Sequence, residues 1–566
     1  MTNRSEPNQS HEYRLRDAVA LAALVALGVV VPVAFGVASG AAFIPRNDDW
    51  VYRRIALEFA GTGVLALHSV TTMMVGLIVG VQPILRALGD TAVAFAVAGW
   101  SSALAVVIAA YGLARVFLPP RRAALAASLT IVFPGYLAYA TSFMTDAPAV
   151  AAQFICLGLG ANAVRARPVR TGQLTAALVA GFVGFSIREF AIAAPMAVAG
   201  SALWADRRQW STWTLSALFG IGCVALYALK LTLPGQAVSG GVGTGAITNM
   251  FPALTSISLV ALPAALLAAR HSFRTWPRFD IALGAEIGLI VAAADVMLSS
   301  EANAPAALLD NLTSQFGVPS SWYLIGGRPL VLGNTAWLLF NAVAVVSAVI
   351  ASTVAVCIAT GYIRRCRRSG RTLSSIIGQP HGVIALFILA VLAGLTAYSV
   401  RFAVFDRYLW SLLPPLAILL LAQSHLPERR VSAGRMLDVV ASLSLLSWCA
   451  LLGVSVMFML NSYAFDAARW QGGDRLVNAG IPGAAIDAGY EWVGEHQPEL
   501  PPPNPPPGGE TFYEHWWPER VTCAVVAGSP PPKNLPTVGL VRWSLFLVTG
   551  PPETLYLYRA AAGCPA

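Results

Sequence analysis

The sequence predicts an all-α polytopic membrane protein with about 13 transmembrane helices and a small C-terminal domain outside the membrane. Its 566 residues are 56% hydrophobic and only 11% charged, and the mean hydropathy is +0.65. Long apolar runs recur along most of the chain, and after Asn461 charged, tryptophan and proline residues become more frequent. These three observations are typical of a chain that crosses a membrane many times and ends in a soluble domain.

The apolar runs define the expected helices, because a helix needs about 20 apolar residues to cross the hydrocarbon core. We expect spans at 17–43, 90–116, 123–141, 147–164, 172–187, 190–204, 211–232, 252–269, 279–298, 334–362, 381–402, 407–424 and 438–460. The runs at 172–187 and 190–204 are short, which predicts broken or tilted helices. The first run ends without a clear small-residue cleavage site, so we expect it to remain as a transmembrane helix.

Basic residues occupy alternate connectors between these runs, which predicts the orientation of the chain. Arginines lie before the first run and after the second, fourth, sixth, eighth, tenth and twelfth runs. Because positive residues favour the cytoplasmic side, we expect a cytoplasmic N-terminus and an extracytoplasmic C-terminal domain. The net charge of +9 is thereby explained by topology rather than by nucleic-acid binding. The expected outer loops are 44–89, 143–147, 233–251, 299–333 and 402–407.

The C-terminal region is predicted to form a domain at 463–566, after a transmembrane domain at 1–462. Its alternating apolar pattern indicates a small α/β or α+β domain. Strands are expected at 522–527, 540–549 and 555–559. Cys523 and Cys564 both lie in this region, where an oxidising compartment permits a disulfide. Two free thiols are the alternative, and the sequence leaves that choice open.

The first outer loop, at 44–89, holds two adjacent carboxylates, Asp48 and Asp49, soon after the first apolar run. Ionisable groups at membrane depth are costly, and a functional role is therefore the first hypothesis for them. A carboxylate in this position can accept the proton of an acceptor hydroxyl. The alternatives are a solvated pair, or a cap for an amphipathic helix that we expect at 51–66 in the interface.

Further charged residues lie at the outer ends of predicted helices. Asp146 starts the fourth helix, where an ordinary helix-start role is the alternative. Arg188 and Glu189 form the outer turn between the two short runs. Arginine binds phosphate oxygens well, and a local ion pair is the alternative there. Arg407 opens the twelfth run, where it meets either an anionic headgroup or its neighbour Asp406.

Several function classes find no support in the sequence. It contains no Walker loop, no GxSxG motif and no GxGxxG motif after a predicted strand. The seven cysteines form no CxxC pair, and His68 is the only histidine of the first outer loop, without a partner at ligand spacing. The sequence therefore indicates neither a soluble nucleotide substrate nor a metal site.

Four short stretches, taken together, resemble the GT-C class of membrane glycosyltransferases. The resemblance is to the branch that contains protein O-mannosyltransferases and lipid A aminoarabinose transferases, and it covers roughly residues 15–425. The stretches are Asn47-Asp48-Asp49-Trp50 followed by Tyr52, Thr145-Asp146-Ala147-Pro148, Ile187-Arg188-Glu189, and Asp406-Arg407-Tyr408-Leu409 followed by Pro414-Pro415. Each stretch is short, and their order and common outward side give the set its specificity.

The resemblance implies an inverting transfer of a hexosyl or pentosyl unit from a polyprenyl-phosphate-linked sugar. An acid of the first outer loop acts as the general base in that family, so Asp48 or Asp49 is implied. Asp48 is favoured, with Asp49 orienting it or contacting donor or acceptor, and the sequence leaves the choice between the two open. The residues implied in substrate binding are Tyr52, Asp146, Arg188, Glu189, Arg328 and Arg407. The arginines are expected near the donor phosphate, because a phosphate leaving group gains charge that cations stabilise.

The resemblance also bears on cofactors, acceptor and location. It implies no obligatory metal, but some family members use a divalent cation, which leaves metal dependence open. The C-terminal region lacks the β-trefoil-like repeat of the protein mannosyltransferases, which favours an envelope glycan or lipid acceptor over a protein. Membrane lipid is an expected partner and nucleic acid is not. The implied location is the bacterial plasma membrane, and the turn at 486–492 is similar to one in bacterial members of the family.

The alternative is a multi-span transporter or flippase for a lipid-linked envelope precursor. Such a protein would predict an inverted internal repeat and charged groups in the middle of helices. The sequence shows no clear repeat, and the candidate charges lie at the outer ends of the predicted helices. These two features favour the transferase.

Overall fold

The computed structural model describes most of the 566-residue chain. The described residues are 7–68, 72–235, 247–272, 275–298, 309, 313–318, 324–370, 376–400, 404–422, 435–501, 513, 516–517, 519–548, 551–560 and 564. Within them the chain is mostly helical, with one small sheet near the C-terminus. The predicted all-α polytopic class with a small C-terminal domain is confirmed.

Helices follow one another through most of the chain. The first are α1 (Pro7–Val25), η1 (Ala26–Val30), α2 (Val31–Ser39), η2 (Ala41–Phe43), α3 (Asp49–Thr62), α4 (Val75–Leu88), α5 (Ala92–Phe117), α6 (Pro120–Ile131), α7 (Tyr136–Tyr139), α8 (Asp146–Arg165), α9 (Thr171–Ile187), η3 (Glu189–Ile192), α10 (Ala193–Ala205) and α11 (Trp210–Thr232). The later ones are η4 (Ile247–Asn249), α12 (Met250–Ser272), α13 (Arg278–Leu298), α14 (Asn334–Arg368), α16 (Pro380–Ser399), η8 (Asp406–Leu412), α17 (Leu413–Ala422), α18 (Arg435–Asn478), η9 (Gly483–Ala485) and α19 (Tyr490–His496).

Nine helical stretches of the described residues are long and apolar enough to cross a membrane. They are Arg14–Ser39, Ala92–Phe117, Asp146–Arg165, Trp210–Thr232, Met250–Arg270, Arg278–Leu298, Asn334–Arg368, Pro380–Ser399 and Asp438–Asn478. The other predicted runs correspond to the shorter helices α6 with α7, α9, α10, and η8 with α17. The predicted number of about 13 spans is therefore not confirmed.

The predicted span at 123–141 is divided between α6 and α7 for a local reason. Pro134 has no amide hydrogen to donate, and Gly135 adopts a φ of 94°, which side chains disfavour. The chain therefore turns after α6, and α7 adds only one further turn of helix. Tyr136, directly after this turn, is buried in the main hydrophobic core.

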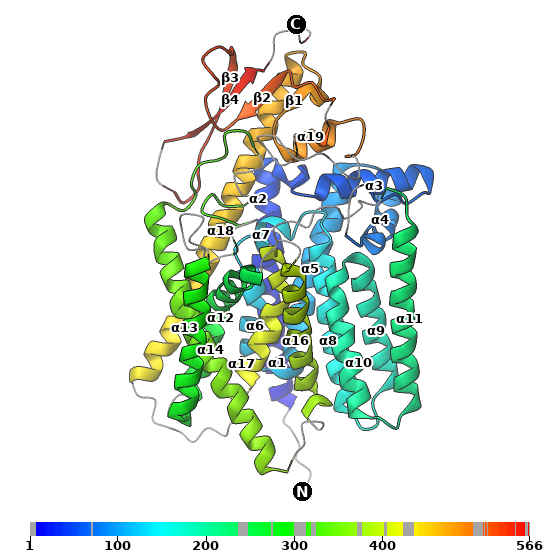
Figure 1. Cartoon of the computed structure of the whole chain (residues 1–566), viewed down its shortest axis with the longest axis vertical. Coiled ribbons are helices and arrows are strands. Elements are labelled where there is room, and N and C mark those ends of the chain that lie inside the picture. The colour runs from blue at the N-terminus through cyan, green and yellow to red at the C-terminus, as the bar shows by residue number, and fades with distance from the viewer. Residues whose placement is uncertain are drawn as a thin grey trace.

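The long helices form a bundle that carries the sheet at one end, while α1 begins at the other end (Figure 1). Helix α3 lies crosswise to the bundle at the end nearer the sheet (Figure 1). It overlaps the predicted amphipathic helix at 51–66 but ends at Thr62, because Gly63 adopts a φ of 70°. The described part of the segment predicted as the first outer loop thus forms a structured layer between the bundle and the C-terminal region.

The C-terminal sheet contains β1 (Ile486–Asp487), β2 (Ala524–Ala527), β3 (Thr537–Trp543) and β4 (Glu553–Arg559) in the order β1-β2-β4-β3. Strand β1 is parallel to β2, and β4 is antiparallel to both β2 and β3. The third strand ends at Trp543, before the predicted end at 549. Leu547 has a φ of 60°, which does not continue a strand.

Two features fix this sheet to the rest of the chain. Phe465, Ala468 and Leu476 of α18 share a hydrophobic cluster with strand residues. Helix α18 also runs through the predicted boundary between 462 and 463 without a break. Cys523 and Cys564 form a disulfide, which decides the alternative that the sequence left open.

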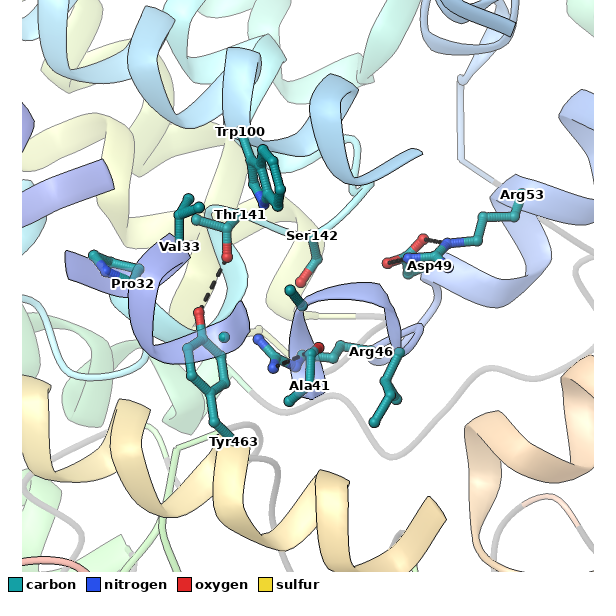
Figure 2. Close-up of a pocket in the computed structure, with 13 residues that line it drawn as sticks. Pro32, Val33, Ala41, Arg46, Asp49, Arg53, Trp100, Thr141, Ser142 and Tyr463 are labelled. Carbon is teal, nitrogen blue, oxygen red and sulfur yellow. Dashed lines mark hydrogen bonds and ion pairs between the residues drawn. The ribbon is translucent and has the colours of Figure 1, made fainter. Parts of the chain in front are cut away.

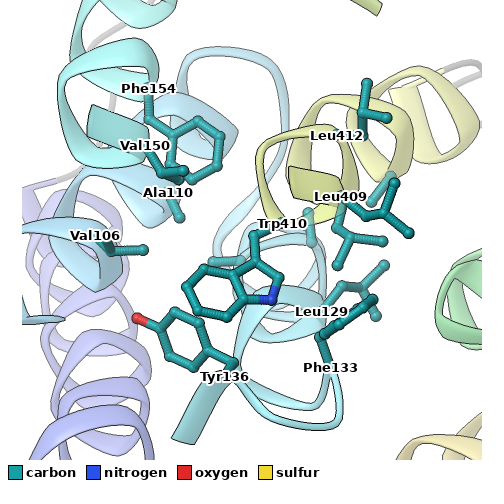
Figure 3. Close-up of a cluster of buried hydrophobic side chains, with 14 of the residues drawn as sticks. Val106, Ala110, Leu129, Phe133, Tyr136, Val150, Phe154, Leu409, Trp410 and Leu412 are labelled. Atoms are coloured by element: carbon teal, nitrogen blue, oxygen red, sulfur yellow. The ribbon is translucent and has the colours of Figure 1, made fainter. Parts of the chain in front are cut away.

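The main core holds the short helix η8 against the bundle. The rings of Tyr136 and Trp410 meet edge to face with their centroids 5.1 Å apart (Figure 3). Val106 of α5 and Phe154 of α8 belong to the same buried cluster (Figure 3). Between membrane helices such packing gains mainly from close van der Waals contact. It places Asp406 and Arg407, at the start of η8, beside the start of α8.

Candidate active site

The two adjacent carboxylates of the first outer loop lie in different surroundings. Asp49 accepts two hydrogen bonds from the guanidinium of Arg53, one turn later on α3, at 2.6 Å and 2.9 Å. Its Oδ2 also accepts the backbone N–H of Phe143 at 3.3 Å. The side chain is only 1% exposed. Asp49 is therefore a buried and fully engaged ion-pair partner that fixes α3 to the loop before α8.

Asp48 is more open. Its side chain is 28% exposed, and its Oδ2 lies 3.3 Å from Nη2 of Arg407. Its Oδ1 accepts a hydrogen bond from the hydroxyl of Tyr490 at 3.0 Å. Asp48 occupies the N-cap position of α3, but among the described residues its carboxylate makes no capping hydrogen bond. The capping alternative therefore does not explain its side chain.

Asp146, the first residue of α8, lies between two guanidinium groups. Its Oδ1 is 3.7 Å from Nε of Arg188, and its Oδ2 is 3.8 Å from Nε of Arg407. The residue is 1% exposed, yet in the described part of the chain neither carboxylate oxygen has a hydrogen-bond partner. Buried polar atoms are nearly always hydrogen-bonded, so this unsatisfied carboxylate marks a place where a ligand can bind.

Arg188 is held in place by neutral partners. Its Nη1 donates to Oγ1 of Thr145 at 2.6 Å, and its Nη2 donates to the hydroxyl of Tyr408 at 3.0 Å. The guanidinium also lies over the ring of Tyr408, 5.3 Å from the centroid. These contacts orient the cation toward Asp146 without neutralising it.

The Arg407 side chain lies between the carboxylates of Asp48 and Asp146, and Asp406 holds its backbone. The Asp406 carboxylate accepts the backbone N–H groups of Arg407 at 2.7 Å and of Thr313 at 2.8 Å. Asp406 thus holds the main chain, and the Arg407 side chain extends to Asp48 and Asp146. Among the described residues, Nη1 of Arg407 has no hydrogen-bond partner.

Tyr52 completes this group from α3. Burial first, and then the negative charge of Asp48, raise the pKa of the Tyr52 hydroxyl above its usual range. Arg188, Arg407 and Asp146 also act on it electrostatically. Five of the predicted residues, Asp48, Tyr52, Asp146, Arg188 and Arg407, therefore come together in one cluster, which we call the acid–arginine cluster.

Glu189 and Arg328 face other partners. Oε1 of Glu189 lies 2.6 Å from Nζ of Lys230 and accepts the backbone N–H of Met73 at 2.6 Å, which links α11 to the segment before α4. The Arg328 guanidinium lies over the ring of Phe465 at 4.4 Å, and burial lowers its pKa to about 10. The structure thus does not place these two residues with the acid–arginine cluster.

A second charged network joins the first outer loop to the C-terminal region. Arg46 pairs with Asp466 at 3.0 Å, and Asp466 pairs with Arg469 at 3.3 Å. Asp466 and Arg469 both lie on α18. Arg469 pairs in turn with Glu491 of α19 at 2.8 Å. Glu491 accepts the backbone N–H of Asn47 at 2.9 Å. This network determines where α19 lies relative to residues 46–48.

A small pocket borders the Asp49 side of the loop. Figure 2 shows Asp49, Arg53, Trp100 and Ser142 among the residues that line it. Asp49, rather than Asp48, belongs to this lining.

Three residues of the site were not singled out from the sequence. Thr145 and Tyr408 lie within two of the motifs that carry the resemblance, but only their contacts with Arg188 give them a role. Tyr490 lies 442 residues from Asp48 in the sequence, so no local spacing connects the two. Its neighbourhood was recognisable only as the turn at 486–492.

The described side chains around the acid–arginine cluster do not fit a resident metal ion. Within the described ranges, no three His, Cys, Asp or Glu side chains gather closely enough to hold one. Asp48 and Asp146 share the Arg407 guanidinium, at 3.3 Å and 3.8 Å, and its positive charge disfavours a further cation between them. No step proposed below uses a metal.

Comparisons with known proteins gave only distant structural matches. No family model matches the chain, and no curated protein matches its sequence. The structural matches are to solved proteins at 12–13% identity. One is the archaeal oligosaccharyltransferase AglB from Archaeoglobus fulgidus, in complex with an inhibitory peptide and a dolichol-phosphate, with 12% identity, a TM-score of 0.42 and 90% of this chain covered. The match covers 61% of AglB, so this chain spans about three-fifths of its length.

A second match is ArnT from Cupriavidus metallidurans bound to undecaprenyl phosphate. It shows 13% identity and a TM-score of 0.42, over 95% of this chain and 98% of that one. The apo state of the same ArnT gives 12% identity and a TM-score of 0.36, with 98% of both chains covered.

Proposed function

We propose that the chain is an inverting glycosyltransferase that moves a sugar from a polyprenyl-phosphate-linked donor to an acceptor hydroxyl on the outer side of the membrane. The observation that carries the proposal is the acid–arginine cluster. In it, a partly exposed carboxylate lies beside a buried, unsatisfied carboxylate and two arginines, all contributed by segments far apart in sequence. The resemblance of the four motifs supplies the class of donor.

The proposed reaction has one base and one leaving group. Asp48 accepts the proton of the acceptor hydroxyl while that oxygen attacks the anomeric carbon of the sugar. The bond between that carbon and the lipid phosphate breaks on the opposite face, which inverts the configuration. The phosphate leaves as an anion, and Arg188 and Arg407 stabilise the charge that it gains.

The different surroundings of Asp48 and Asp49 support Asp48 as the base. Both oxygens of Asp49 are occupied by Arg53, whose fork matches a carboxylate bidentately. Asp48 is partly exposed, so an acceptor hydroxyl can reach it. The two oxygens of Asp146, which have no hydrogen-bond partner among the described residues, suit the hydroxyl groups of a sugar, which are hydrogen-bond donors.

The test is sugar transfer by purified protein in bacterial lipid vesicles. The donors are radiolabelled undecaprenyl-phosphate-linked hexoses and pentoses, and the acceptor is a total envelope fraction. We expect Asp48→Asn to lower kcat by about 100-fold or more. Asp474→Asn, at an exposed acid of α18, is the control and should transfer at the unaltered rate. Full transfer by Asp48→Asn would remove Asp48 as the base, and movement of uncleaved donor across the vesicle would instead indicate a transporter.

The proposal names the chemical class of the donor sugar and of the acceptor. The donor is a hexose or pentose on a polyprenyl phosphate, and the acceptor is an envelope glycan, lipid or protein. The site then faces the outer side of a bacterial plasma membrane, with the N-terminus in the cytoplasm. Asp474→Cys, in a variant whose five free cysteines are replaced by serine, should react with a membrane-impermeant thiol reagent from the outer side only, which tests this orientation.

A further inference from the structure

The segment that carries Asp48 is held by the C-terminal region at three consecutive residues. Arg46 pairs with Asp466 of α18 at 3.0 Å. The backbone N–H of Asn47 donates to Glu491 of α19 at 2.9 Å, and Asp48 accepts the hydroxyl of Tyr490 at 3.0 Å. Tyr490 and Glu491 are adjacent, so the first turn of α19 contacts both Asn47 and Asp48.

The backbone at this point needs such support. Asn47 adopts a φ of 54°, a left-handed conformation that few residues other than glycine adopt. It is 3% exposed, and its N–H is directed at the Glu491 carboxylate. The turn at Asn47 separates the side chains of Arg46 and Asp48, which go to different partners. Contacts with the C-terminal region therefore favour the conformation that presents Asp48.

The Tyr490 ring is itself fixed by aromatic neighbours. Its centroid lies 5.7 Å from those of Trp50, Tyr513 and Trp516. The residue is only 3% exposed. A side chain packed in this way has little freedom, so its hydroxyl is a fixed donor to Oδ1 of Asp48, while Arg407 approaches Oδ2.

We propose that Tyr490 is a positioning residue for the reaction, through which the C-terminal region completes the active site. The proposal rests on the proposed function, in which Asp48 is the base. The Tyr490 hydroxyl holds the carboxylate against the pull of Arg407. Without it, the carboxylate turns both oxygens to the guanidinium, because a two-point pair of this kind is favourable. Asp48 is then closed to the acceptor hydroxyl although the fold is intact.

The test compares two tyrosines of the same aromatic cluster. Tyr490→Phe keeps the ring and removes the hydroxyl that reaches Asp48. Tyr513→Phe removes a hydroxyl that donates to Asp487 instead, at 3.2 Å. A hydrogen bond to a charged group corresponds to a factor of about 10 to 100. We expect Tyr490→Phe to lower kcat by that factor while the KM for the undecaprenyl-phosphate-linked donor stays the same, and Tyr513→Phe to leave both unchanged.

Stability is measured in parallel, because a structural role would lower the thermal midpoint as well. Equal thermal midpoints for the two variants, with kcat reduced only in Tyr490→Phe, support the positioning role. Unchanged kcat in Tyr490→Phe, or an equal loss of kcat in both variants, overturns it. If Tyr490→Phe does not fold, Tyr490→Met takes its place, because it also removes the hydroxyl, and an unchanged kcat in that folded variant would likewise overturn the role.

These outcomes are distinct from failure of the proposed function. If Asp48→Asn transfers sugar at the unaltered rate, the base assignment fails and Tyr490 has nothing to position. If Asp48→Asn is inactive while Tyr490→Phe is fully active, only the role of Tyr490 is lost.

Discussion

Two buried carboxylates of this protein face arginines in opposite ways. Asp49 and Asp146 are almost equally buried, with side chains 1% and 2% exposed. Asp49 meets Arg53 at 2.6 Å and 2.9 Å, whereas Asp146 stays 3.7 Å and 3.8 Å from the nearest nitrogens of Arg188 and Arg407. A buried ion pair offsets its desolvation only when its geometry is close and its hydrogen bonds are made. The first pair meets that condition and the second does not, so Asp146 keeps hydrogen-bonding capacity that its described neighbours do not use.

The largest expected effect breaks the structural pair. Asp49→Asn leaves the Arg53 guanidinium buried without its counter-charge, which costs about 3–5 kcal/mol of stability. The thermal midpoint in detergent should fall clearly below that of the wild type. The adjacent Asp48→Asn is the matched control, because Asp48 is partly exposed and such pairs contribute at most about 1 kcal/mol. The comparison fails if Asp48→Asn is the less stable variant.

The second prediction concerns the longer ion pair between Asp146 and Arg407. Arg407→Lys keeps the positive charge but loses the planar fork that binds phosphate. We expect the Kd for undecaprenyl phosphate to rise about 10- to 100-fold, with a nearly unchanged thermal midpoint. Arg53→Lys alters the other arginine in the same manner and should lower the midpoint without changing that Kd. A Kd that rises equally in both variants would show that the two pairs do not differ in function.

The sequence predicted well those features that depend on local composition. The length of the apolar runs predicted where most helices lie. The short motifs singled out Asp48, Asp146, Arg188 and Arg407, which the structure brings together in one cluster. The division of the run at 123–141 at Gly135 was also readable in principle, because proline and glycine stand side by side there. In these cases the cause lies within a few residues of the effect.

Features that depend on distant segments were not predictable. Adjacent residues turn to different partners, so sequence alone did not separate Asp48 from Asp49, or Arg188 from Glu189. The choice is made by Arg53 on the next turn of α3 and by Lys230 on α11. Tyr490 is an extreme case, because the loop that it contacts is at the other end of the chain.

The smallest expected effect tests whether Glu189 belongs to the site. Glu189→Gln weakens the ion pair with Lys230 but retains an oxygen for the N–H of Met73. The Glu189 side chain is 35% exposed, so solvent screens the pair and the loss of stability should stay below about 1 kcal/mol. The Kd for undecaprenyl phosphate should not change, whereas Arg188→Lys, one residue earlier, should raise it. An equal rise in the Kd for Glu189→Gln would place Glu189 in donor binding after all, and the acid–arginine cluster would then extend to α11.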